Sequence, residues 1–158
     1  MIFNKNLKNI LLVIFATLIL SACSTAKKSG NIDGDVYTGK ETVEYLASGG
    51  PDRVFFATNK SSLTTASRAT LRKQANYLRK NKSLNVTIEG HADERGTREY
   101  NLALGERRAN AAKDYLMTYG ISGKRISVIS YGKEKPVNPA STPLAWSQNR
   151  RSVTVKVN

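Results

Sequence analysis

The chain has 158 residues, enough for one small domain and too few for several. It carries 25 Lys and Arg against 12 Asp and Glu, a formal net charge of +13, which favours anionic partners. A single cysteine excludes an internal disulfide, so the folded part depends on its own hydrophobic core.

The N-terminal segment has the pattern of a lipoprotein signal. Lys5 and Lys8 precede an apolar run from Ile10 to Leu20, and the small residues Ser21 and Ala22 lead into Cys23. The run is shorter than the roughly 18 residues that span a bilayer and is typical of a signal peptide. The alternative is an N-terminal membrane anchor or a buried core helix. We therefore predict that residues 1–22 are a signal peptide and that Cys23 is lipidated.

Lipidation determines the expected compartment. A cysteine that carries a diacylglycerol and an N-acyl chain such as palmitate anchors stably in a membrane, which a single chain does not. Ser24 stands after Cys23, where an aspartate would favour the inner membrane, so we expect an anchor at the periplasmic face of the outer membrane. Cleavage would remove Lys5 and Lys8 and leave a net charge of about +11. The anions outside the cytoplasm are phospholipid headgroups and cell-wall carboxylates, which argues against nucleic acid.

Composition divides the remaining chain into two parts. Residues 23–51 are rich in Ser, Thr, Gly and Lys and have little periodic apolar content, which predicts a lipidated N-terminus followed by a flexible linker. Val43, Tyr45 and Leu46 could dock this linker on the domain. Residues 52–158 are expected to form one small domain.

Strands and helices alternate in the predicted domain. Apolar periodicity and capping residues predict the following elements. They are a strand over Arg53–Phe56, a helix from Thr64 or Thr65 to Lys80, a strand over Leu84–Glu89, a helix from Thr97 to Tyr119, a strand over Arg125–Tyr131, a helical turn over Pro143–Asn149 and a strand over Arg151–Val157. The order β-α-β-α-β-β predicts an α/β (α+β) two-layer sandwich with a mixed sheet and both long helices on one face.

The second long helix carries the polar pattern that suggests a site. Gly105 lies mid-helix, where glycine costs roughly 1 kcal/mol relative to alanine and often marks a close approach. Asn101, Gly105 and Arg108 fall in a narrow arc beside the apolar stripe, next to Leu104, and the loop with Asp93 leads into this helix. An Asp and an Arg in one pocket can hold a zwitterion, the Asp binding an ammonium and the Arg a carboxylate. The alternative is that the two side chains pair with each other or face solvent.

Several motifs carry a resemblance to a known family. They are Glu89–Thr97 (EGHADERGT), Glu99–Asn101 (EYN), Leu104–Asn110 (LGERRAN), Ser130–Pro136 (SYGKEKP), Asn149–Arg151 (NRR) and the Leu20–Cys23 signal (LSAC). Together they resemble the peptidoglycan-associated lipoproteins (Pal), which belong to the wider family of OmpA-like peptidoglycan-binding domains. The resemblance covers about Val54 to Val157.

The resemblance implies non-covalent binding of the diaminopimelate-containing peptide stem of peptidoglycan. On the matching positions, Asp93 would bind the ammonium and Arg108 the carboxylate of that residue. The pocket would be lined by Arg95, Thr97, Asn101 and Leu104. The chain has Ala57-Thr58-Asn59 where the family commonly has acidic residues, so contacts from Thr58 and Asn59 would use backbone groups or the Asn59 amide.

The resemblance also implies a cellular role. The protein would tether the outer membrane to the cell wall as part of the Tol-Pal system in envelope integrity and cell division. TolB and other Tol components would be its protein partners. The alternative is a partner-binding module of the Tol system with little cell-wall binding.

Two other classes of function are disfavoured by the residues. His91, Asp93 and Glu94 could suggest an enzyme or a metal site, but His91 is the only histidine, and neither a second ligand cluster nor a nucleophile with its base is evident. We expect no catalysis and no cofactor, with His91 hydrogen-bonded at the end of its strand. Nucleic-acid binding is disfavoured because the sequence lacks aromatic residues interleaved with basic ones. Trp146 is expected to pack beneath the last strand.

Overall fold

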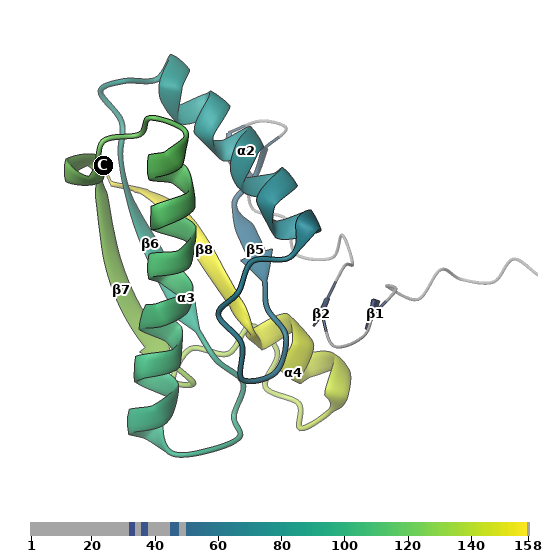
Figure 1. Cartoon of the computed structure of the whole chain (residues 1–158). Coiled ribbons are helices and arrows are strands. Elements are labelled where there is room, and N and C mark those ends of the chain that lie inside the picture. Colours follow the sequence, from purple (N-terminus) through teal and green to yellow (C-terminus); the bar gives the residue numbers. More distant parts are fainter. Residues whose placement is uncertain (1–31, 34–35, 38–44, 48–49, 158) are drawn as a thin grey trace, which may run out of the picture.

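The computed structural model describes residues 32–33, 36–37, 45–47 and 50–157 (Figure 1). The predicted signal peptide, Cys23 and Val43 lie outside these residues. Before the domain, β1 (Ile32–Asp33) pairs with β2 (Val36–Tyr37), and β3 (Tyr45–Ala47) pairs with β4 (Gly50–Pro51), both antiparallel. Strand β4 lies beside the first long helix, so the end of the predicted linker packs on the domain.

A mixed four-stranded sheet forms the centre of the fold. Its strands are β5 (Arg53–Phe55), β6 (Asn85–His91), β7 (Ile126–Gly132) and β8 (Arg151–Val157), in the spatial order β5-β8-β6-β7. Strands β6 and β7 are parallel, whereas β8 is antiparallel to both β5 and β6. The predicted mixed sheet is confirmed.

Two long helices, α2 (Thr65–Lys80) and α3 (Arg98–Thr118), cover one face of this sheet (Figure 1). The short helices η1 (Gly123–Arg125) and α4 (Pro143–Asn149) precede β7 and β8. Thr64 and Thr97 cap the long helices, each accepting a hydrogen bond from a backbone N–H three residues later. The two-layer sandwich predicted from the element order is confirmed.

The hydrophobic core lies between the helices and the sheet. Its fully buried members come from both layers, and they are Phe56, Leu71, Ala75, Leu78, Ile88, Ala109, Ala112 and Leu116. After α3, Gly120 adopts a φ of 80° and Ile121 N–H donates to Leu116 O, an arrangement in which a glycine ends a helix. The buried side chain of Ile121 then joins this core.

The buried face of α3 differs from the predicted one. Helical periodicity predicts Asn101, Gly105 and Arg108 beside an apolar stripe that includes Leu102, but all three are buried, whereas Leu102 is only half-buried. The cause is the close approach of α3 to β6 at two glycines. A Cβ on Gly90 would overlap the carbonyl oxygen of Gly105, so the helix rests directly on the strand.

Candidate binding site around Asp93 and Arg108

Four segments meet at one end of the sheet. They are the loop after β5, the loop between β6 and α3, the first turns of α3, and the junction of α4 with β8. The register places Gly90, near the end of β6, opposite Ser152, near the start of β8. Side chains from the beginning and the end of the domain therefore converge on the loop that carries Asp93.

Asp93 is a buried carboxylate whose oxygens are both occupied by arginines. Its Oδ1 accepts from the backbone N–H of Arg95 at 3.1 Å and from Arg95 Nε at 3.0 Å. Its Oδ2 accepts from Arg95 Nη2 at 2.8 Å and from Arg150 Nη1 at 3.3 Å. Arg150 is itself buried and also donates through Nε to Phe56 O. Asp93 therefore lies between a buried arginine, Arg150, and a partly exposed one, Arg95.

The arginine partners keep Asp93 ionised. Burial acts to raise the pKa of this carboxyl, but the hydrogen bonds and charge of Arg95, together with Arg150, outweigh burial and hold the pKa below its usual value. The Arg95 side chain is 42% exposed while that of Asp93 is 9% exposed. Arg95 therefore covers the carboxylate from the solvent side.

Arg108 is fully buried and ties three backbone segments together. Its Nε donates to Lys60 O at 2.9 Å, its Nη1 to His91 O at 2.8 Å and its Nη2 to Ala57 O at 3.0 Å. A guanidinium has five N–H donors, so these bonds use three and leave two for another acceptor. Burial, and next the charge of Arg150, lower the pKa of Arg108 to about 10, so it stays positive at neutral pH.

The structure contradicts both alternatives for Asp93 and Arg108. In residues 50–157 the two side chains form no ion pair with each other; Asp93 pairs with Arg95 and Arg150, while Arg108 bonds carbonyl oxygens. Neither faces solvent, since Asp93 is 7% and Arg108 0% exposed. The arc on α3 and the loop do meet at one site, as the sequence predicted.

The other predicted residues have different roles around this site. Thr97 caps α3 through a hydrogen bond from Tyr100 N–H, and Asn101 donates through Nδ2 to Arg95 O, which fixes the loop. Leu104 is buried. Thr58 Oγ1 accepts from Arg95 Nη2 at 3.2 Å. Asn59 is exposed in a tight turn with a φ of 55°, a conformation that Asn tolerates better than most residues.

Two contributors, Arg150 and Trp146, were missed by sequence reasoning. Arg150 was noted as part of a motif but not given a role. Trp146 does not pack beneath the last strand; its ring lies under the Arg95 guanidinium at 4.3 Å, and its Nε1 donates to Glu94 Oε1 at 2.8 Å. The available signal was the clustering of Trp146 and Arg150 within one short segment before the last strand.

His91 departs from its expected hydrogen-bonded role. It is 1% exposed, and neither imidazole nitrogen has a hydrogen-bond partner within the described part of the chain. The ring packs on Tyr131 at 5.6 Å, while its backbone carbonyl receives Arg108. Burial first, and then the charges of Arg151, Lys135 and Arg53, lower the pKa of His91 to about 3. His91 is therefore neutral and structural.

The charge balance of the site defines what it can bind. One carboxylate, Asp93, lies among three guanidiniums, those of Arg95, Arg108 and Arg150. Such a site suits a ligand with a carboxylate as well as an ammonium. No group of three His, Cys, Asp or Glu side chains that could hold a metal ion occurs among the described residues. No helix within residues 50–157 is long and apolar enough to cross a membrane.

Comparison with known proteins identifies the family. The model of the OmpA family matches residues 55–150. The chain is 45% identical over 152 residues to the peptidoglycan-associated lipoprotein of Rhizobium meliloti (strain 1021), covering 92% of this chain and 86% of that protein.

Two solved structures extend the likeness. The crystal structure of the peptidoglycan-associated lipoprotein from Burkholderia pseudomallei matches with a TM-score of 0.65 and 38% identity, over 67% of this chain and 90% of that one. The cell wall anchor of the T6SS from Pseudomonas aeruginosa matches with a TM-score of 0.56 and 28% identity, over 69% and 85%.

The chain therefore belongs to the OmpA family and, within it, to the peptidoglycan-associated lipoproteins. The resemblance stated from the sequence motifs is confirmed. Members of this family are structural proteins of the cell envelope rather than enzymes, which agrees with the expectation of no catalysis.

Proposed function

We propose that the domain binds the peptide stem of peptidoglycan non-covalently, through the free ammonium and carboxylate of its diaminopimelate residue. The observation that carries this proposal is the single ionised carboxylate of Asp93 placed among three guanidiniums. The names of the relatives, a peptidoglycan-associated lipoprotein and a cell wall anchor, support binding to peptidoglycan.

Binding proceeds by exchange of ion-pair partners. Asp93 accepts the ligand ammonium in place of the Arg95 side chain, which is the solvent-exposed partner of the pair and can leave without any change in the hydrophobic core. The ammonium then has to replace the bonds that Arg95 makes to Asp93 and Thr58 and its contact with the Trp146 ring. The released Arg95 guanidinium then reaches the ligand carboxylate. Arg108 is fully buried, so it attracts the same carboxylate through its fixed positive charge, and its bonds to Ala57 and Lys60 hold the neighbouring loop in place.

The tether is the second part of the proposal. Residues 1–22 form the signal peptide, and acyl chains on Cys23 anchor the protein in the outer membrane. Residues 23–51 then span the gap to the domain at residues 52–158. Many anchored copies act together, so that weak individual contacts suffice. The family resemblance supports work with TolB and other Tol components in envelope integrity and cell division.

Co-sedimentation with diaminopimelate-type peptidoglycan tests the proposal. The probe is a chain of residues 24–158, which keeps every described residue and the whole hydrophobic core but lacks Cys23. We expect this chain to co-sediment and Asp93→Asn to remain in the supernatant, because a neutral amide cannot replace the carboxylate. Arg98→Gln is the control, since Arg98 lies nearby on the surface and, among the described residues, forms an ion pair with Glu134 alone.

Two results would overturn the proposal. Equal sedimentation of the parent, Asp93→Asn and Arg98→Gln would show adhesion to the basic surface rather than a defined site. Absence of binding by a folded parent would instead favour the alternative role, a partner-binding module of the Tol system. Circular dichroism of each variant confirms folding before binding is compared.

A further inference from the structure

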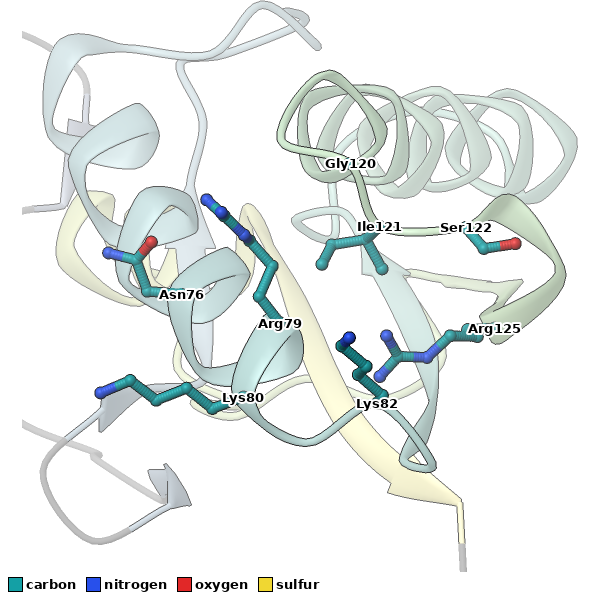
Figure 2. A pocket seen from close by; sticks show the side chains of 8 residues that line it. All are labelled: Asn76, Arg79, Lys80, Lys82, Gly120, Ile121, Ser122 and Arg125. Carbon is teal, nitrogen blue, oxygen red and sulfur yellow. The ribbon is translucent and has the colours of Figure 1, made fainter.

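An open pocket of about 830 Å³ lies at the opposite end of the sheet from Asp93. It is formed where α2 ends and where the loop after α3 leads into β7 (Figure 2). The loop from α2 into β6 forms part of its wall, whereas Asp93 follows the last residue of β6. Seven strand residues at about 3.3 Å each separate the two ends by roughly 20 Å. The pocket and the Asp93 site can therefore be occupied at the same time.

The pocket is lined by cations and by no acidic residue. Its charged members are Arg79, Lys80, Lys82 and Arg125. Figure 2 shows Arg79, Lys82 and Arg125 arranged around Ile121 at the centre of the pocket. Such a concentration of one sign of charge attracts anions.

These cations are not neutralised by the fold. Arg79, Lys80 and Lys82 are exposed, and no ion pair or hydrogen bond joins their side chains to any other residue that the structure describes. The sequence has no Asp or Glu from residue 53 to residue 88. The positive charge at this end is therefore available to an external partner.

Arg125 differs from the other three because it forms a fixed wall. Its Nε donates to Leu84 O at 3.0 Å, and its Nη2 lies within hydrogen-bond distance of Leu78 O, Asn81 O and Leu84 O, the nearest of these contacts being 2.7 Å. These bonds satisfy carbonyls at the end of α2 and hold the guanidinium in place. The fixed Arg125 and the exposed Arg79 and Lys82 then face a shared space, whereas the Lys80 side chain extends away from it (Figure 2).

We propose that this pocket binds the phosphate headgroups of anionic phospholipids at a membrane surface. Guanidinium and ammonium groups are the side chains that recognise phosphate. The basic surface also continues along α2 to the exposed Arg72 and Lys73, seven residues before Arg79 and Lys80 and so on nearly the same helix face. An extended set of separated cations fits a planar array of phosphates better than one small anion.

Vesicle co-sedimentation of the chain of residues 24–158 tests this proposal. Vesicles of phosphatidylcholine alone are compared with vesicles that also contain phosphatidylglycerol. We expect binding to the anionic vesicles only, weakening as salt is added. The double variant Arg79→Gln/Lys82→Gln should bind about 25-fold more weakly, since each cation near an anionic surface contributes roughly fivefold. The double variant Arg98→Gln/Arg107→Gln loses the same charge on the surface of α3 and should bind like the parent.

Competitors distinguish the source of the anion. Inorganic phosphate and polyglutamate, each at matched ionic strength, should fail to displace the parent from anionic vesicles. Displacement by inorganic phosphate would assign the pocket to a free phosphate ion, and tight pocket-dependent binding of polyglutamate would assign it to an acidic protein. Either result overturns the proposal, as does equal loss of vesicle binding in the two double variants.

Discussion

The two ends of the sheet carry similar numbers of cationic side chains, but these have partners within the chain at one end and are mostly exposed to solvent at the other. Around Asp93, each arginine has a partner within the chain: Arg95 and Arg150 bond the carboxylate, and Arg108 bonds three carbonyls. Around Ile121, Arg79 and Lys82 are exposed and have no such partner in the described residues.

This difference separates two ways of recognising an anion. A ligand at the Asp93 end must replace bonds that already exist, so its recognition depends on matching their geometry and charge. A ligand at the other end meets unpaired charges in water, so its binding depends on charge density and on salt. The first arrangement gives selectivity, whereas the second gives long-range attraction.

The largest expected loss of stability comes from a substitution that disrupts the packing of α3 on β6 near Asp93. In Gly90→Ala the new Cβ would overlap the carbonyl oxygen of Gly105, a backbone atom that cannot turn aside, so we expect a loss of about 3 kcal/mol or more in the free energy of unfolding. In Gly123→Ala, near the basic pocket, the new Cβ meets the ends of two flexible side chains, Met117 at 3.3 Å and Lys113 at 4.0 Å, so the loss should be less than about 1 kcal/mol. Urea unfolding measures both, and similar losses would contradict this contrast.

Removal of the buried guanidinium should have the next largest effect. Arg108→Met leaves three carbonyl oxygens without their donor, and we expect it to lower the free energy of unfolding by about 3 kcal/mol. Arg107→Met changes the adjacent, exposed residue on the same helix and should stay within about 0.5 kcal/mol of the parent. Calorimetry provides the comparison. A stable Arg108→Met domain would show that the three bonds do not hold the loop.

Acid should destabilise the Asp93 end through His91. The pKa of His91 is lowered to about 3 in the folded domain, below its value of about 6.5 in an unfolded chain, so the unfolded state gains the proton first. The contribution of His91 to the free energy of unfolding is therefore complete well above pH 6.5 and falls as the pH decreases, by about 1.6 kcal/mol between pH 6.5 and 5.

Urea titrations across this range check the effect of pH. Asp93, whose pKa is also lowered, contributes only at lower pH, where its carboxylate becomes protonated. In His91→Gln the free energy of unfolding should not change between pH 6.5 and 5. An unchanged slope in that variant would assign the acid sensitivity to another group.

The smallest expected effect concerns the unpaired cations. Arg79→Gln/Lys82→Gln removes two charges that no described residue neutralises, so the free energy of unfolding should change by no more than about 0.5 kcal/mol. Thermal unfolding at low salt is the sensitive measurement. A loss above 1 kcal/mol would show that these side chains stabilise the fold, and the basic pocket would then resemble the Asp93 end.

The sheet and helices could be predicted because their signals are local. Alternating Val and Ile residues marked the strands, and Thr97 and Gly120 marked the start and end of α3. The orientation of α3 could not be predicted as well. Helical periodicity gives the angle between Asn101, Gly105 and Arg108, but the approach of Gly105 to Gly90 depends on tertiary packing.

The sequence predicted that the Asp93 loop and α3 meet, but it did not predict which side chains bond to Asp93. The spacing in sequence and the family motifs brought Asp93 and the arc on α3 together. The partners of Asp93 depend on the loop backbone, which directs Arg95 back onto the carboxylate, and on β8, which brings Arg150 from the other end of the domain. The predicted hydrogen bond of His91 was wrong because the sequence of one strand does not show its neighbours in space. The ring packs on Tyr131, and its nitrogens form no hydrogen bond with any residue that the structure describes.

The most direct test of ligand recognition at Asp93 is a calorimetric titration with an isolated diaminopimelate-containing stem peptide, with its side-chain ammonium either free or acetylated. Acetylation should weaken binding to the parent chain of residues 24–158 by about tenfold or more, because a charge-assisted hydrogen bond is lost. The same acetylation should make little difference to Asp93→Asn. An equal loss in the parent and in Asp93→Asn would contradict the assignment of the ammonium to Asp93.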